Sequence, residues 1–444
     1  MGGLDYFLRL AAVACVAALL GLFIARPSAP DRMAERVTAL SNAPGPALAT
    51  KPCGLNREPL TGPFANIADV ISVSPLGGIT APGEVQPAPY IRVNTRKGAT
   101  VFERRQTDAL APARVDITAI ERRLSAAETG KTRTIWTVHF ALCEGYTLVY
   151  DDLESVSSEI LERAGGLASF EEVGGPEHLA KTVQIRVAKG APVGSGRGFD
   201  VAFHDLTAPP ATLARPERHA TNIYARAGVT RTSPELIKAV TPDVRQARCA
   251  IDYMPDALRA NWSALLKDQY GMRTAKGADT CRTQLITEPG AAQGVWHTSP
   301  AHNGATTKVS AIALGPDTIN PEKQIFALHG RVKSLTPELI ALGPFEPEQK
   351  EKAAKDFMTF AGNDETSLVN TPFNAVVPGP LYCYQGLRAN FVGPRMSGVM
   401  LMSISDTQGT QTPLLKLEAR GDIAQCADLP QPWGFSGAET TFYR

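Results

Sequence analysis

Short stretches in which apolar residues alternate with polar ones dominate the chain between about residues 55 and 207. They are rich in β-branched and aromatic residues and are separated by turn residues, a pattern typical of half-buried strands. One helix is predicted among them, over residues 155–164, with Ser155 as its N-cap. We expect strands in YIRVNT, TVFER, RVDITAIERRL, RTIWTVHFAL, YTLVYDDL, TVQIRVA and FDVAFHDL. Successive strands with short connections predict a sandwich or a barrel-like sheet.

The pattern changes twice further along the chain. Residues 208–295 are less regular, and their clearest helical spacing follows Pro255, where Asp256 is a candidate N-cap. Short strands return from residue 296, interrupted by a charged stretch at 345–365 that predicts a helix. The predicted fold class is therefore mainly β, with short helices between two β domains at 56–207 and 296–444 and a mixed connecting segment at 208–295.

The N-terminus carries the longest apolar run, AAVACVAALLGLFIA at residues 11–25. Residues 1–27 are interpreted either as a secretory signal peptide or as an uncleaved membrane anchor, and residues 28–55 as an Ala- and Pro-rich linker. Both interpretations place the rest of the chain outside the cytoplasm. We therefore expect a periplasmic or extracellular protein, which an uncleaved segment would anchor to the inner membrane.

The cysteines agree with export. Of the 7 cysteines, Cys15 lies inside the apolar run, which leaves an even number for disulfides. We expect Cys249 to pair with Cys281, and Cys383 with Cys426, because the members of each pair fall within one predicted domain. The pair Cys53 and Cys143 follows only by elimination.

Charge and motifs exclude several common functions. Lys and Arg number 45 against 44 Asp and Glu, so the basic excess of a typical nucleic-acid-binding protein is missing, and no nucleic-acid partner is expected. No G-x-S-x-G segment predicts a serine nucleophile, and GSGRG at 194–198 precedes a strand rather than a phosphate-binding helix. The histidines form neither HExxH nor HxH, and His139 is interpreted as a sheet residue.

Four segments stand in an informative order within residues 80–205. They are LAPARVDITAI at 110–120, YTLVYDDL at 146–153, VAKGAPVG at 187–194 and GFDVAFHD at 198–205. In order and spacing this region, about a third of the chain, resembles the lysostaphin/LytM-type zinc metallopeptidases. The resemblance implies the duplicated-hybrid-motif fold for residues 56–207. LYCY at 381–384 and the C-terminal WGFSGAETTFYR resemble exported prokaryotic proteins in which a small β domain follows a peptidase-like domain.

The resemblance does not extend to the catalytic residues of that family. It places the first zinc-binding His near Tyr90, the His of the Y-x-H-L motif at Asp152, and the H-x-H pair at Gly198 and Asp200. Tyr90, Asp152 and Asp200 are therefore candidates for a vestigial groove, and no residue is expected to be catalytic. Carboxylates without imidazole suit a harder cation better than zinc, so zinc and other cofactors are not expected.

Three interpretations of Asp152 and Asp200 stay open. In the first, both aspartates are polar residues at sheet edges that bind backbone N–H groups. In the second, they are remnants of a groove that binds a ligand without cleaving it. In the third, they belong to a rebuilt metal or catalytic site. Two carboxylates brought close together would repel each other and raise one pKa, unless a cation or an arginine lies between them.

Three functions follow from these interpretations. The first is a non-catalytic exported envelope protein that binds peptidoglycan or another envelope component, by analogy with the family alone. The second is a metal-dependent cell-wall hydrolase with a non-standard site. The third is a purely structural or assembly protein.

Overall fold

The computed structural model describes residues 58–78, 87–95, 105–126, 132–211, 244–277, 280–282, 289–300, 311–329, 357–362, 367–389, 395, 397–405 and 413–444. The expected N-terminal apolar segment, the linker and Cys53 lie outside these residues. Among the described residues, no helix is both long and apolar enough to cross a membrane.

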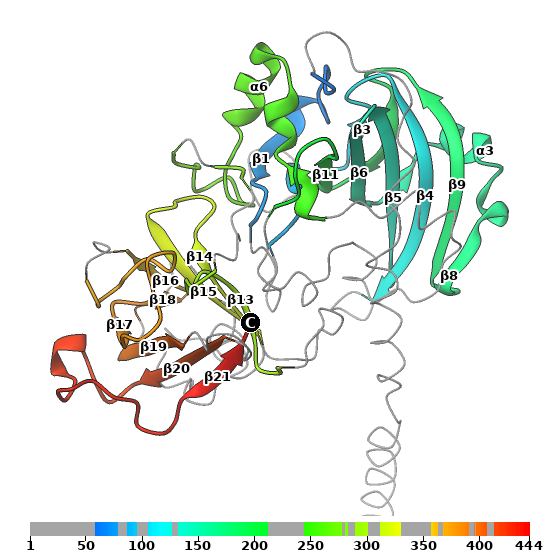
Figure 1. Ribbon diagram of the computed structural model, residues 1–444. Helices are drawn as coiled ribbons and strands as arrows, with labels where there is room; N and C mark the ends of the chain where they lie inside the picture. The colour runs from blue at the N-terminus through cyan, green and yellow to red at the C-terminus, as the bar shows by residue number, and fades with distance from the viewer. Residues whose placement is uncertain are drawn as a thin grey trace, which may run out of the picture.

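The protein is mainly β, as predicted, and its antiparallel sheets include a nearly closed, barrel-like one. The first unit is built on a sheet with the strand order β1-β2-β11-β6-β5-β4-β9-β8, to which β12 adds beside β11 (Figure 1). These strands are β1 (Val70–Ser74), β2 (Ile91–Thr95), β4 (Val115–Ala126), β5 (Thr132–Cys143), β6 (Tyr146–Leu153), β8 (Glu171–Gly175), β9 (His178–Val187), β11 (Phe199–Asp205) and β12 (Ala247–Arg248).

A smaller three-stranded sheet and short helices complete the first unit. The small sheet consists of β3 (Thr107–Leu110), β10 (Pro192–Gly196) and β7 (Ser155–Val156). The helices are η1 (Ile67–Asp69), α3 (Ser158–Arg163), η2 (Leu167–Ser169), η4 (Val244–Gln246), η5 (Ala250–Tyr253) and α6 (Asp256–Ser263).

Both predicted helices of this region exist, but each N-cap lies one or two residues from the predicted position. Ser157 takes the N-cap position of α3 because Ser155 already pairs with β10 in the small sheet. Pro255 precedes α6, whose first residue is Asp256. An acidic side chain in the first helical turn still favours both starts through the helix dipole.

One hydrophobic core holds the first unit together, and alternation along the strands produces it. In β11 the side chains of Phe199, Val201 and Phe203 enter this core, while the residues between them face the other side of the sheet. Residues 244–281, which the sequence assigns to a connecting segment, supply further core side chains, among them Met254 and Trp262. The core therefore extends past residue 207.

The C-terminal unit is a second antiparallel sheet, in the order β17-β19-β20-β21-β13-β14-β15-β16-β18. Its elements are β13 (Gly294–His297), β14 (Ala311–Pro316), β15 (Lys323–His329), β16 (Phe357–Ala361), β17 (Tyr382–Tyr384), β18 (Arg388–Ala389), β19 (Val399–Ser405), β20 (Leu414–Arg420), η7 (Cys426–Asp428) and β21 (Thr440–Tyr443).

The helix expected at 345–365 is wrong where the structure describes it. Residues 357–361 form strand β16, which pairs with β15. Met358 and Phe360 enter the core of this unit, and their spacing of two residues is that of a strand rather than of a helix.

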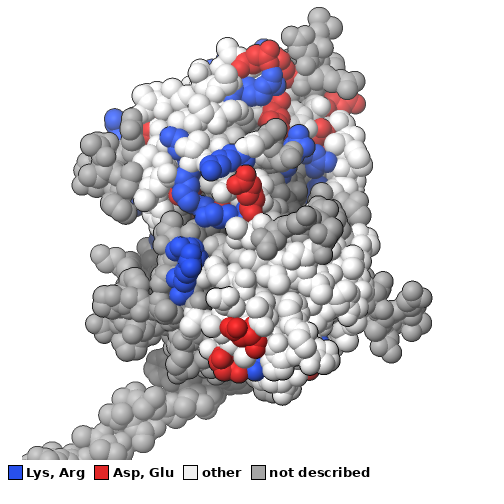
Figure 2. Space-filling view, turned by 90° about the vertical axis from the view of Figure 1, so that its left-hand side faces the viewer, with Lys and Arg blue, Asp and Glu red and all other residues white. Residues whose placement is uncertain are grey.

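The two units are joined by polar contacts as well as by the chain. The guanidinium of Arg273 lies 2.6 Å from the buried carboxylate of Asp317, in the connection between β14 and β15. The backbone N–H of Lys276 donates to the carbonyl of Ile319 at 2.9 Å. Figure 2 shows the face on which the units lie one above the other: charged side chains of both signs gather in its upper and middle parts, and most of its lower part is uncharged.

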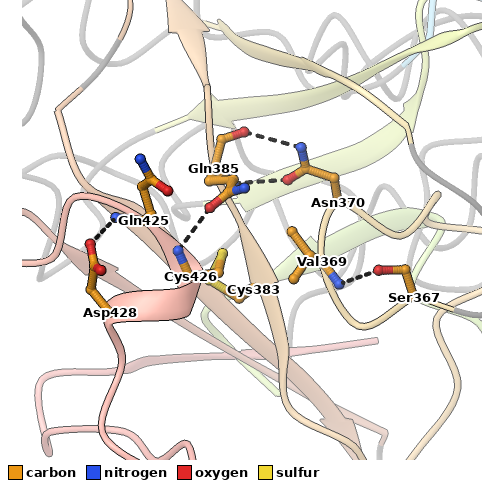
Figure 3. The surroundings of a disulfide bond; sticks show 8 residues. All are labelled: Ser367, Val369, Asn370, Cys383, Gln385, Gln425, Cys426 and Asp428. Atoms are coloured by element: carbon orange, nitrogen blue, oxygen red, sulfur yellow. Dashed lines mark hydrogen bonds between the residues drawn. A yellow bond between two sulfur atoms is a disulfide. The ribbon is translucent and has the colours of Figure 1, made fainter.

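Two predicted disulfides are confirmed, Cys249–Cys281 and Cys383–Cys426, and they are compatible with an oxidising, exported location. Cys143 is also disulfide-bonded, and Cys53, its predicted partner, lies outside the described residues. Around Cys383–Cys426, the side-chain oxygen of Gln385 accepts from the Cys426 N–H at 2.8 Å (Figure 3). Asn370 binds both backbone groups of Gln385, so this bridge joins β17 to η7 within a continuous hydrogen-bonded network.

Removing the Cys383–Cys426 bridge with C383A/C426A should lower the free energy of unfolding of the C-terminal unit by about 4 kcal/mol. The reason is that the bridge closes a loop with a sequence separation of 43 residues and so restricts the unfolded chain. Urea unfolding measures the effect. C249A/C281A is the matched control and should destabilise the first unit instead, and an unchanged C-terminal transition in C383A/C426A would contradict the prediction.

Candidate functional site: a buried polar face with an arginine between two aspartates

The large sheet carries a second, polar face opposite the hydrophobic core. The registers align Ser74 with Arg92, Arg92 with Asp200, and Asp200 with Asp151 on four neighbouring strands. Residues paired across antiparallel strands point to the same face, so these side chains form one polar row. Asp200, Glu121, His139 and His178 on this face are largely buried, whereas Arg92, Arg123, Asp151 and Arg133 are partly exposed. The buried charges need partners within the protein.

Arg92 lies at the centre of this row, between the two aspartates that the sequence singles out. Its Nη1 donates to Asp200 at 2.7 Å and its Nη2 donates to Asp152 at 2.6 Å. The other oxygen of Asp152 accepts from Nη2 of Arg133 at 2.6 Å. Two guanidinium groups thus bind Asp152, and strands β2, β5, β6 and β11 are linked through them.

A β-bulge brings Asp152 to this face. Trp136 pairs with Leu153 and Val138 pairs with Tyr150, so two residues of β6 lie opposite the single Thr137 of β5. Asp152 has a φ of 63°, in the left-handed region that costs a non-glycine residue about 1–2 kcal/mol. Because of the bulge, the side chains of Asp151 and Asp152 lie on the same face of the sheet instead of on opposite faces.

Asp151 continues the row on the other side. Its Oδ1 accepts from Nη2 of Arg123 and from the hydroxyl of Thr137, both at 2.6 Å. Burial acts to raise the pKa of Asp151, but the charge of Arg123 and these hydrogen bonds lower it below its ordinary value. Asp151 therefore stays ionised on this face, where its side chain is 36% exposed.

The next member of the row is Glu121 on β4, which lies between two histidines. The Nε2 atoms of His139 on β5 and His178 on β9 lie 2.5 and 2.6 Å from its two oxygens. Burial acts to raise the pKa of Glu121, yet the hydrogen bonds and charges of the two histidines bring it well below its usual range. His139 is thus a hydrogen-bonded sheet residue, as the sequence predicts. Among the described residues, no group of three or more His, Cys, Asp or Glu could hold a metal ion.

Asp200 differs from the other acids of this face in the direction of its pKa. Its side chain is 9% exposed, and burial, together with the charges of Asp152 and Asp151, raises its pKa to about 7 against the opposing effect of Arg92. The charge of Asp200 is the largest influence on the pKa of Arg92 and raises it. Burial acts to lower the pKa of Arg92, and Asp152 raises it further. Arg92 is therefore a permanent cation between its two carboxylates.

Two of the three predicted site residues, Asp152 and Asp200, bind the same side chain. That side chain belongs to Arg92, which the sequence does not single out. The side-chain hydrogen bonds of Asp152 and Asp200 go to Arg92 and Arg133. Tyr90 is half-buried and precedes Arg92 by two residues. Alternation in YIRVNT could have placed Arg92 on the polar face, because Ile91 and Val93 on either side of it enter the core.

Replacing Arg92 by Met should lower the free energy of unfolding of the first unit by about 3 kcal/mol at pH 7, because it leaves two largely buried carboxylates without their shared partner. Urea unfolding measures this, and adding D200N to R92M should recover part of the loss. The matched control is R186M, which breaks the exposed Arg186–Asp116 pair and should lower the free energy of unfolding far less than R92M does. Equal losses in R92M and R186M would contradict the assignment.

The pKa of Asp200 predicts a pH dependence of defined sign. A carboxyl that titrates near pH 7 when folded and near 3.8 when unfolded takes up a proton on folding between these values. Its stabilising contribution is therefore complete below about pH 3.8 and is lost as the pH rises to about 7. The unfolding free energy of the wild type relative to D200N, measured from pH 4 to pH 8, should fall with rising pH. A flat or rising difference would show that the pKa is not raised.

Comparisons of this chain with protein-family models, with curated proteins and with solved structures found no match.

Proposed function

We propose that this protein is a non-catalytic, exported protein of the cell envelope that binds peptidoglycan or another envelope component. One observation carries the proposal: Arg92 lies between Asp152 and Asp200 and forms an ion pair with each. The residues placed at the positions of a zinc peptidase's histidines are thereby engaged with a fixed organic cation.

The chemistry of a guanidinium supports binding rather than hydrolysis. A metal ion in a hydrolase polarises a carbonyl group and lowers the pKa of a bound water, which requires an open coordination position. A guanidinium is always charged, holds carboxylates through planar N–H donors and has no coordination position for water. Asp152 and Asp200 would have to lose Arg92 before they could bind a metal ion or activate water.

The compartment and the fold belong to the same proposal. The disulfides fit an oxidising location, and the apolar run at residues 11–25 would export the chain or anchor it to the inner membrane. The polar face would then be the counterpart of the peptidase site in a degenerate duplicated-hybrid-motif domain. The residue order in 110–205 supports this relation.

Sedimentation with purified, insoluble peptidoglycan tests the proposal on the full chain in mild detergent. We expect the protein to sediment with peptidoglycan and to release no soluble fragments, with or without added zinc. Failure to sediment would favour the structural or assembly role. Stoichiometric zinc in the purified protein, together with wall lysis that D200A abolishes, would establish the metal-dependent hydrolase instead.

A further inference from the structure

We propose that Arg133 and Arg92, held on either side of Asp152, form a binding site for a carboxylate group of the ligand. This inference rests on the proposed binding function and specifies the chemistry that is recognised. It concerns the exposed end of the polar row, where three strands and a bulge bring two arginines to one residue.

Asp152 organises this end of the row. Its two oxygens are divided between the arginines, Oδ2 for Arg92 and Oδ1 for Arg133, each at 2.6 Å. Its left-handed backbone conformation is one that few non-glycine residues adopt, and such residues concentrate at binding and catalytic sites. The carboxylate of Asp152 therefore fixes the position of two guanidinium groups at the cost of an unfavourable conformation.

The arginines keep donors that no residue in the described part of the chain uses. A guanidinium has five N–H donors, and within the described part of the chain Arg133 uses only Nη2, for Asp152. Its side chain is 42% exposed, against 15% for Asp152, so its remaining donors face water. Arg92 is 29% exposed and uses both Nη atoms. Arg133 is thus the arginine that can take up a ligand, and Arg92 adds charge behind it.

The turn between β10 and β11 packs its backbone closely against Arg92. A Cβ built on Gly198 would lie 3.7 Å from Nη2 of Arg92 and 3.1 Å from the carbonyl oxygen of Val93. Gly198 has a φ of 118°, which side-chain-bearing residues rarely adopt, so the backbone alone covers this side of the guanidinium. The site therefore ends in a glycine at the position where the resemblance aligns the first histidine of the family's H-x-H pair.

The local charge favours an anion. Arg92 and Arg133 face Asp152 and Asp200, but burial raises the pKa of Asp200 to about 7, so this acid is only partly ionised at neutral pH. At the exposed end of the row, two guanidinium groups share the single carboxylate of Asp152. A planar carboxylate matches the planar donor edge of a guanidinium and can accept two parallel N–H bonds from it. The peptides of peptidoglycan carry free carboxylates of this kind.

Calorimetric titration of the full chain tests the site with N-acetyl-D-alanyl-D-alanine and with its C-terminal amide. We expect the free acid to bind at least about tenfold more tightly than the amide, and R133Q to weaken binding of the free acid by a similar factor, a change of about 1.4 kcal/mol. R163Q is the matched control, because the Arg163 side chain is 44% exposed and pairs with Glu159 on the surface. It should bind like the wild type.

The outcomes separate this inference from the function on which it rests. Equal affinities for acid and amide, or an unchanged affinity in R133Q with the same urea midpoint as the wild type, would overturn the carboxylate site even if peptidoglycan sedimentation succeeds. Arg133-dependent binding of the free acid without sedimentation would support the site and refute peptidoglycan as the ligand. Inorganic phosphate that competes as strongly as the free acid would overturn the assignment to carboxylates.

Discussion

The first unit depends on one electrostatic constraint: charged side chains that the sheet holds largely out of water must find partners within the protein. The apolar face needs only side chains of suitable volume, whereas an unpaired carboxylate or guanidinium removed from water costs several kcal/mol. The polar face meets this constraint with pairs that cross strands. The pairs of Arg92 with Asp200 and of Glu121 with its two histidines join neighbouring strands, and the pair of Arg123 with Asp151 links β4 to β6 across β5. The polar row thus fixes strand register as the hydrophobic core does on the other face, because a slip of one residue would separate every pair.

These pairs respond to pH in opposite directions. The pKa of Glu121 lies below its unfolded value of 4.5, so its stabilising contribution is present above that pH and is lost as the pH falls. The pKa of Asp200 is raised to about 7, so its contribution is lost as the pH rises toward that value. Together, these two acids contribute most to the free energy of unfolding in weakly acidic solution. There Glu121 is ionised in the native state and Asp200 is still protonated in part.

Sequence reasoning predicted strands such as β5, β6 and β11 and two disulfides, but not the partners on the polar face. Alternation in FDVAFHD predicts a strand with one apolar side, because Phe199, Val201 and Phe203 repeat with a period of two. It does not reveal that the other side is buried as well, since that depends on the rest of the fold. The bulge at Asp152 breaks the period of two, and the partnership of Arg92 with Asp152 spans 60 residues. The expected repulsion between two nearby carboxylates did indicate that an arginine or a cation would be needed.

A site built around an arginine differs chemically from a site built around a metal ion. A divalent cation has an unfilled coordination position and withdraws electron density from whatever enters it, whereas a guanidinium carries a single charge spread over three nitrogens. The guanidinium also comes on a side chain fixed by its strand, so its affinity for the aspartates does not depend on metal supply. A ligand that approaches Arg133 therefore meets oriented N–H donors and a positive potential but no Lewis acid. These donors and charges can select a ligand by its shape and charge, but they cannot activate water as a metal ion does. The proposed non-catalytic role follows from this difference.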